Sequence, residues 1–185
     1  MTAPVKIAAV TAALALTATA AAAGASPLEA SIGFETGMGG IDDPHGPDPL
    51  LATFGLRGGI GWCRLQLLGG LDFVAAQTAP TSATDPGRYA AGGRAMLGVR
   101  LAVHERRVID DQVTLRFSVD ASAGEIVHQG GPAAALGERD LQLGASAQFG
   151  VTPISVSLGV MLLFPDGRGP AGAIVSGGYR WGRTL

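Results

Sequence analysis

Side chains able to do catalysis are few in this chain, and the best-placed set is Ser122, Glu125 and His128. A serine, a carboxylate and a histidine are the residue types of a hydrolytic triad, in which each side chain is oriented by the next. These three are too loosely placed along one short segment for that orientation. We therefore predict that His128, like His45, is a solvated loop histidine, and that His104 lies at a turn.

Two places in the sequence carry side chains of the types that bind metals, an acidic cluster and a single cysteine. Asp42, Asp43 and Asp48 gather in one Gly- and Pro-rich stretch and could offer oxygen ligands to Ca²⁺. The spacing of an EF-hand loop is absent, so we expect these carboxylates to be solvated. Cys63 is the only cysteine, so it forms no internal disulfide and makes no zinc site by itself. The sequence predicts no metal.

A glycine pattern late in the chain resembles a nucleotide-binding motif. Gly167, Gly169 and Gly172 have the spacing of the dinucleotide fingerprint. Phosphate binding requires a helix to begin directly after these glycines, because its free N–H groups hold the anion. Here Pro170 lies within the motif and an extended segment follows. We predict a loop at this position, no cofactor, and a protein that is not an enzyme.

The composition limits the class of protein. Of 185 residues, 47% are hydrophobic, 29 are glycine and only 15% are charged, against roughly 25% charged residues in a typical soluble domain. The sole lysine is Lys6. The net charge of −2 and the lack of a basic run exclude a nucleic-acid partner.

The first 25 residues differ from the rest and predict a cleavable signal peptide. A short start with one positive charge, Lys6, precedes an apolar run over residues 7–23. The small residues Ala23, Gly24 and Ala25 then form the pattern that signal peptidase cleaves. We place the cleavage after Ala25, with Ala23 as a nearby alternative, and the other interpretation is a retained N-terminal membrane anchor. Residues 26–185 would then form one exported domain.

Hydrophobic residues alternate with small or charged residues through the exported domain. A period of two is the pattern of strands with two different faces. It predicts eight antiparallel strands, most of them ten or more residues long. They fall at residues 28–38, 50–60, 65–73, 89–103, 113–122, 141–149, 154–164 and 173–181.

The predicted connections differ in length between the two ends of the strands. Long connections occupy residues 39–49, 77–88, 128–138 and 165–172. Tight turns lie at 61–64 and 150–153, and the turn at 104–111 is of intermediate length. Long loops at one end and short periplasmic turns at the other are typical of transmembrane barrels. We predict an all-β, eight-stranded, up-and-down transmembrane β-barrel.

The polar face supports an interior rather than a water-facing surface. It is mostly Gly, Ser, Ala and Thr, with no lysine, and such small side chains suit the narrow lumen of an eight-stranded barrel. Arginines and acids on this face nearly balance, and charges withdrawn from water must pair. We predict a structural charge network in the lumen, which would act as a plug rather than select anions. Its members are Glu29, Glu35, Arg57, Arg64, Asp72, Arg94, Arg100, Arg116, Asp120 and Arg180, with Asp140 facing the same way.

Few aromatic residues are available for the girdles of a membrane barrel. Trp62, Tyr89, Tyr179 and Trp181 fall near strand ends on the apolar face. Transmembrane barrels carry such residues at both membrane interfaces, where one end of the ring is apolar and the other is wet. We predict that these four residues form a thin girdle.

The pattern over the whole exported domain resembles the small outer-membrane barrel superfamily of the OmpA/OmpX type. Members usually end in an aromatic residue read by the assembly machinery, where this chain has Leu185. The resemblance implies the outer membrane of a Gram-negative bacterium, with the lipid bilayer and the assembly machinery as partners. It also implies a structural, envelope-integrity or loop-mediated role. Two alternatives stay open: a soluble periplasmic barrel that binds a small apolar ligand, and a lipid-modifying outer-membrane enzyme.

Overall fold

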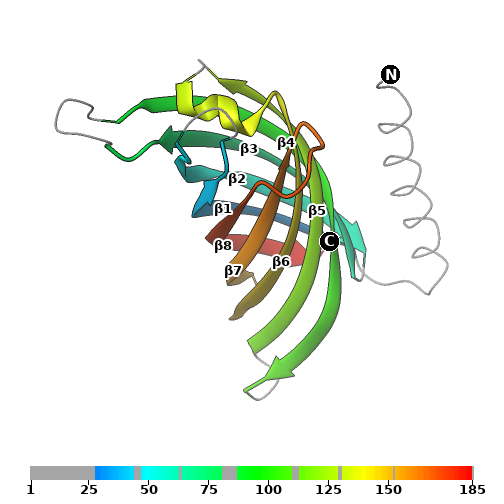
Figure 1. Ribbon diagram of the computed structural model, residues 1–185. Coiled ribbons are helices and arrows are strands. Elements are labelled where there is room, and N and C mark those ends of the chain that lie inside the picture. The colour runs from blue at the N-terminus through cyan, green and yellow to red at the C-terminus, as the bar shows by residue number, and fades with distance from the viewer. Residues whose placement is uncertain are drawn as a thin grey trace, which may run out of the picture.

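The protein forms a closed barrel of eight antiparallel strands in up-and-down order, as a computed structural model shows (Figure 1). The structure describes residues 28–43, 47–62, 64–80, 87–109, 113–128, 131–151 and 153–184. The predicted fold class is confirmed. The predicted signal peptide (residues 1–25), Pro44, His45, Cys63 and Leu185 lie outside the described residues.

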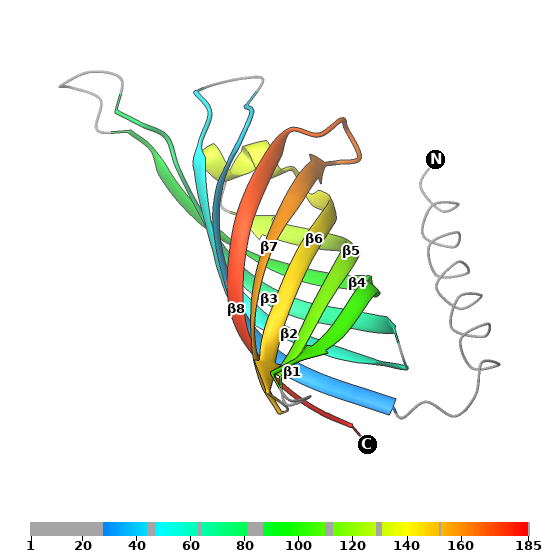
Figure 2. The same ribbon diagram turned by 90° about the horizontal axis from the view of Figure 1, so that it is seen from below.

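The strands are 12 to 20 residues long, and each pairs with its neighbours in sequence. Their bounds are β1 Leu28–Ile41, β2 Leu50–Trp62, β3 Leu65–Gln77, β4 Tyr89–Val108, β5 Val113–His128, β6 Arg139–Val151, β7 Ile154–Pro165 and β8 Gly172–Thr184. β1 pairs with both β2 and β8, and this second pairing closes the barrel. Figure 2 shows the strands wrapping around one axis, with the longer connections gathered at one end.

The barrel therefore has a loop end and a turn end. At the turn end β2–β3, β4–β5 and β6–β7 are joined within a few residues. At the loop end four longer connections join β1–β2, β3–β4, β5–β6 and β7–β8. The predicted difference between the two ends is present.

The turn predicted at residues 104–111 is wrong in extent, because β4 continues to Val108. A β-bulge between Ala102 and His104 adds one residue to β4 opposite β5. An extra residue reverses which face the following side chains occupy. Beyond the bulge His104 is therefore opposite the outward-facing Phe117, and Glu105 is opposite Arg116 on the inner face. In Figure 1 the β4–β5 hairpin (green) extends past the neighbouring strands.

The connection predicted as loop 128–138 contains a 3₁₀ helix, η1 (Gly131–Leu136). Figure 1 shows η1 (yellow) at the loop end, and it contacts β3, β4 and β5. Its Leu136 is 1% exposed and belongs to an apolar cluster inside the barrel. Leu163 and Ile174, both fully buried, and Ile41 and Leu51 are other members. An apolar core thus fills the loop end of the lumen.

Glycines inside the wall make room for long side chains across a narrow lumen. A methyl group at Gly55 would lie 2.1 Å from Oδ1 of Asp72 and 2.4 Å from the carbonyl oxygen of Leu71. One at Gly70 would lie 2.9 Å from Cδ of Arg57. The glycine-rich polar face therefore lets Arg57 and Asp72 lie across the wall and meet in the interior.

Candidate functional site

The outer face of the barrel is apolar. On β7 the outward residues Val156, Leu158, Val160 and Leu162 are 44% to 64% exposed, while Leu163, which faces inward, is fully buried. Every strand contributes large exposed apolar side chains of this kind, such as Ile32, Leu56, Leu71, Leu97, Val119, Leu143, Leu158 and Val175. Monomeric soluble proteins rarely expose an apolar surface that encircles the whole molecule. This surface suits lipid as its solvent.

The four predicted interface aromatics all lie on this outer face. Trp62, Tyr179 and Trp181 are 42% to 48% exposed and lie toward the turn end, as their pairing with β1 and β7 places them. Tyr89 begins β4 at the loop end and is 66% exposed. Three of the four therefore gather around the turn-end rim near β1 and β8.

The part of the lumen next to the apolar core, on its turn-end side, holds a chain of buried ion pairs. The Arg94 side chain is fully buried and bridges two strands: Nη2 lies 2.6 Å from Oδ2 of Asp72, and Nη1 lies 2.9 Å from Oδ2 of Asp140. Arg57 Nη2 also bonds Oδ2 of Asp72, at 2.9 Å. Gln142 Nε2 donates to Oδ2 of Asp140 at 2.5 Å. These residues link β2, β3, β4 and β6 across the lumen.

The middle of the lumen holds a second, bidentate pair. Arg100 Nε and Nη2 donate to the two carboxylate oxygens of Asp120 at 2.6 and 2.9 Å. Ser146 Oγ lies 3.3 Å from the same carboxylate. Such a fork-to-fork pair fixes geometry as well as charge. It joins β4, β5 and β6 directly below the Arg94 pairs.

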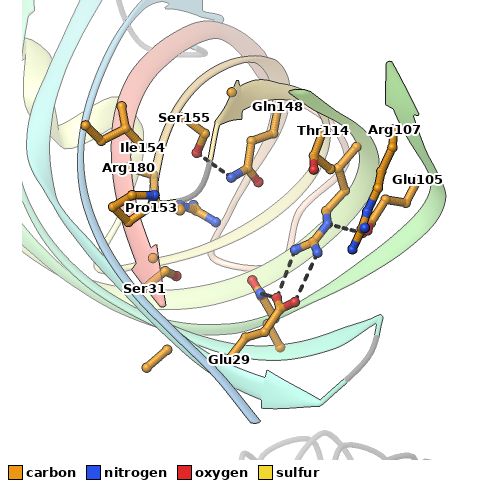
Figure 3. A pocket seen from close by; sticks show the side chains of 15 residues that line it. Glu29, Ser31, Glu105, Arg107, Thr114, Gln148, Pro153, Ile154, Ser155 and Arg180 are labelled. Atoms are coloured by element: carbon orange, nitrogen blue, oxygen red, sulfur yellow. Dashed lines mark hydrogen bonds and ion pairs between the residues drawn. The ribbon is translucent and has the colours of Figure 1, made fainter. Parts of the chain in front are cut away.

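At the turn end the interior widens into a polar cavity of about 180 Å³ (Figure 3). Arg116 is held there by two glutamates: Nε lies 2.6 Å from Glu105 Oε2, and Nη1 lies 3.1 Å from Glu29 Oε2. Gln66 Nε2 also donates to Glu29, at 3.2 Å. Arg180 lines the same cavity. Figure 3 shows Glu29, Glu105 and Arg180 reaching into this space from different strands.

The structure thus brings nine of the ten residues of the predicted charge network into the lumen. Glu35 lies 3.7 Å from Nε of Arg57, a long contact. Arg180 is buried but forms no ion pair or hydrogen bond with any residue that the structure describes. Arg64 is different. It lies in the β2–β3 turn with its side chain exposed, because β2 ends at Trp62 and the chain reverses there.

Sequence reasoning missed Glu105 and Gln142 as members of the interior network. Glu105 faces the lumen only because the bulge in β4 changes the parity of the strand. Gln142 is an uncharged residue of the predicted polar face, 2% exposed. The η1 segment was also missed, because its alanine-rich sequence carries no strand alternation.

The possible triad is not assembled. Ser122 and His128 lie six positions apart on β5, about 20 Å along an extended strand. Glu125 has the opposite parity from both and is exposed. These residues therefore cannot act on one another.

The other candidate ligands have structural roles or open surroundings. Asp48 accepts a hydrogen bond from the backbone N–H of Asp43 at 3.0 Å. Gly167 and Gly169 have open space where a side chain would be, in the β7–β8 connection. Within the described ranges no group of three or more His, Cys, Asp or Glu side chains could hold a metal ion. In the same ranges no helix is long and apolar enough to span a membrane.

No model of a protein family matches the sequence, and no curated protein matches it in sequence. Among solved structures the fold is similar to Neisserial surface protein A, with a TM-score of 0.45 and 9% identity over 82% of this chain and 96% of that one. It is also similar to Ail, the attachment invasion locus protein of Yersinia pestis, in complex with the heparin analogue sucrose octasulfate. There the TM-score is 0.41 and the identity 13%, over 84% of this chain and 99% of that one. At such values the likeness carries no functional argument.

Proposed function

We propose that this chain is a small integral barrel of the bacterial outer membrane, with a non-enzymatic role in the envelope. The observation that carries the proposal is the inverted distribution of polarity. Large apolar side chains encircle the outside, whereas fully buried arginine and aspartate side chains bond one another inside. A water-soluble barrel needs the opposite arrangement, because its charges stabilise it by facing solvent.

The filled lumen favours a structural or loop-presenting role over transport. The apolar core under η1, the Arg94 pairs and the Arg100–Asp120 pair lie one above another along the axis. An eight-stranded barrel is only wide enough for its own side chains. The loops between β1–β2, β3–β4, β5–β6 and β7–β8 then remain as the surface that meets the cell's surroundings.

The two alternatives have less support. A soluble carrier for a small apolar ligand needs an apolar cavity, and the turn-end cavity is lined by arginines, glutamates and glutamines. A lipid-modifying enzyme needs a nucleophile beside its base, and Ser122 and His128 are separated along β5. The first hypothesis to test is therefore that the protein is embedded in the outer membrane.

Cell fractionation of the mature protein tests this proposal directly. We expect it in the outer-membrane fraction, soluble only with detergent, and migrating differently on gels before and after heating. A mature protein that stays monomeric and soluble in water without detergent would overturn the membrane assignment.

A matched pair of variants sharpens the test. Leu158 lies near the middle of β7 and is 64% exposed on the outer face. Leu158→Arg should cost roughly 2–4 kcal/mol if this face meets the centre of a bilayer. The same change on a water-exposed face would be close to neutral. The control is Ile109→Arg, in the β4–β5 turn, which should cost little in either case.

A further inference from the structure

One buried arginine of the lumen, Arg180, forms no ion pair or hydrogen bond with the residues that the structure describes. Arg180 is 6% exposed, yet no carboxylate or other acceptor in the described part of the chain lies within bonding distance of it. The other strand arginines buried in the lumen, such as Arg94 and Arg100, are each fixed by aspartates. A buried cation without a counter-charge is costly unless something else supplies the missing interactions.

The guanidinium of Arg180 faces the turn-end cavity rather than the packed interior. Arg180 is among the residues that line that cavity, and Figure 3 shows it reaching into the space that they share. Across the ladder it is opposite Ser155 on β7 and Gly33 on β1. A methyl group at Gly33 would lie 2.5 Å from the carbonyl oxygen of Tyr179 and 3.0 Å from Cα of Arg180, so β1 and β8 approach closely here.

Two hydroxyl groups flank this arginine. Ser31 lies two residues from Gly33 on β1, and its Oγ is buried without a hydrogen-bond partner. Ser155 Oγ accepts a hydrogen bond from Gln148 Nε2, so its own hydrogen is free to donate. Both serines line the cavity together with Arg180. All three side chains carry hydrogen-bond donors and line the same cavity.

The charge of the cavity favours a bound anion. Arg107, Arg116 and Arg180 line it against Glu29 and Glu105. Both glutamates already bond Arg116. Their charges therefore offset that of Arg116, whereas Arg180 bonds no carboxylate among the residues that the structure describes. A cavity of about 180 Å³ has room for a small ion and several waters.

We propose that the turn-end cavity is a binding site for a phosphate-type oxyanion, held by Arg180 with the hydroxyls of Ser31 and Ser155. A guanidinium fork with two hydroxyl donors is a set that recognises a phosphate group. The cavity opens at the turn end, so the phosphate can come as the free ion or as the headgroup of a lipid. The site depends only on the interior of the barrel and stands whether or not the outer face meets lipid.

The test is equilibrium dialysis of the folded mature protein against radiolabelled inorganic phosphate in phosphate-free detergent buffer. We expect saturable binding of one phosphate per chain, and at least roughly tenfold weaker binding by Arg180→Gln. The control is Arg168→Gln, which removes the same charge from an exposed side chain at the loop end. It should bind as the unchanged protein does. Heat-dependent gel migration verifies that each variant is folded.

Competition identifies the source of the phosphate. Displacement of the label by a short-chain phosphatidic acid at lower concentration than by unlabelled phosphate assigns the site to a lipid headgroup. The reverse order assigns it to the free ion. Absence of saturable binding to the unchanged protein, or an equal loss in Arg168→Gln, would overturn the proposal. Ser31→Ala, which removes one donor without changing charge, should weaken binding less than Arg180→Gln does.

Discussion

At the loop end of the barrel the lumen is packed with apolar side chains under η1, whereas at the turn end it is an open polar cavity. Leu136, Leu163 and Ile174 are at most 1% exposed at the loop end. At the turn end the carboxylates of Glu29 and Glu105 are 30% and 35% exposed. Between the two lie the ion pairs of Arg94 and Arg100, both buried.

The difference shows how a narrow barrel can be stabilised by packing at one end of its lumen and keep a polar cavity at the other. Burial of apolar side chains at the loop end stabilises the folded barrel. It also keeps water away from the neighbouring ion pairs, so that removing one partner leaves a buried charge at a high cost in free energy. At the turn end the glutamates that hold Arg116 are partly exposed, so water weakens their ion pairs with it. The same residue types should therefore contribute very differently to stability at the two ends.

The largest expected effect is on the buried ion pairs. Arg94→Met leaves the carboxylates of Asp72 and Asp140 without their shared cation, and should lower the free energy of unfolding by roughly 3–5 kcal/mol. Arg116→Met at the turn end should cost about 1 kcal/mol, because water screens its glutamates. Urea unfolding in lipid vesicles, followed by fluorescence of Trp62 and Trp181, measures both. Equal losses at the two ends would contradict the contrast.

A second expected effect compares the two faces of one strand at the loop end. Leu163 is fully buried in the apolar core, and its neighbour Leu162 is 44% exposed on the outer face. Leu163→Ala should lower the free energy of unfolding by about 3 kcal/mol, because it leaves a cavity. Leu162→Ala opens no internal cavity and should cost about 1 kcal/mol. The same unfolding assay distinguishes them. A larger loss for Leu162→Ala would mean that the loop-end interior is loosely packed.

A third pair of variants compares how tightly the lumen is packed at two positions along the inner face of β2. A methyl group at Gly55 would lie within 2.4 Å of a backbone carbonyl oxygen. At Gly59 the two nearest atoms are side-chain atoms, Ser31 Oγ at 3.1 Å and Leu68 Cδ2 at 3.2 Å, and the backbone carbonyl oxygen of Leu67 is 3.5 Å away. Gly55→Ala should therefore cost about 2 kcal/mol through overpacking, and Gly59→Ala less than about 1 kcal/mol. If Gly59→Ala proves the more costly, the turn-end half of the lumen is the tighter one.

The alternation of residue types predicted the strands and their two faces, and the small residues, the missing lysine and the unequal connections then indicated a barrel with the polar face inside. The alternation also selected Arg94, Asp72, Arg100 and Asp120 as interior charges, since charges on a narrow inner face have only each other to bond. It could not identify their partners, because pairing depends on the register between strands. Asp72 receives both Arg57 and Arg94 only because β2, β3 and β4 align in the observed way.

The features that escaped prediction each depend on a local irregularity. The bulge in β4 transfers Glu105 to the lumen and places His104 outside. The apolar core required η1 to fold back over the loop end, and nothing in its sequence distinguishes it from an exposed loop. Arg64 had the residue type of the interior network, but it lies beyond the end of β2. The unpaired state of Arg180 likewise follows from distances that a sequence does not carry.

The smallest expected effect compares two residues with positive φ in connections at opposite ends. Asp166 (φ 51°), in the β7–β8 loop, accepts hydrogen bonds from the backbone N–H groups of Glu138 and Arg139, both at 3.1 Å. Ile109 (φ 55°), in the β4–β5 turn, is β-branched and 67% exposed. The left-handed conformation is therefore compensated at the loop end and is a cost at the turn end.

Ile109→Asn should consequently raise the free energy of unfolding by about 0.5 kcal/mol, because asparagine tolerates the left-handed region. Ile109→Val retains the β-branch and should leave stability unchanged. Asp166→Gly also permits positive φ but removes the carboxylate that ties the β7–β8 loop to the start of β6, and should cost about 1 kcal/mol. Urea unfolding of the three variants side by side gives the signs. A gain in stability for Asp166→Gly would show that its two hydrogen bonds do not hold the loop, and the contrast between the two ends would then lie in the lumen alone.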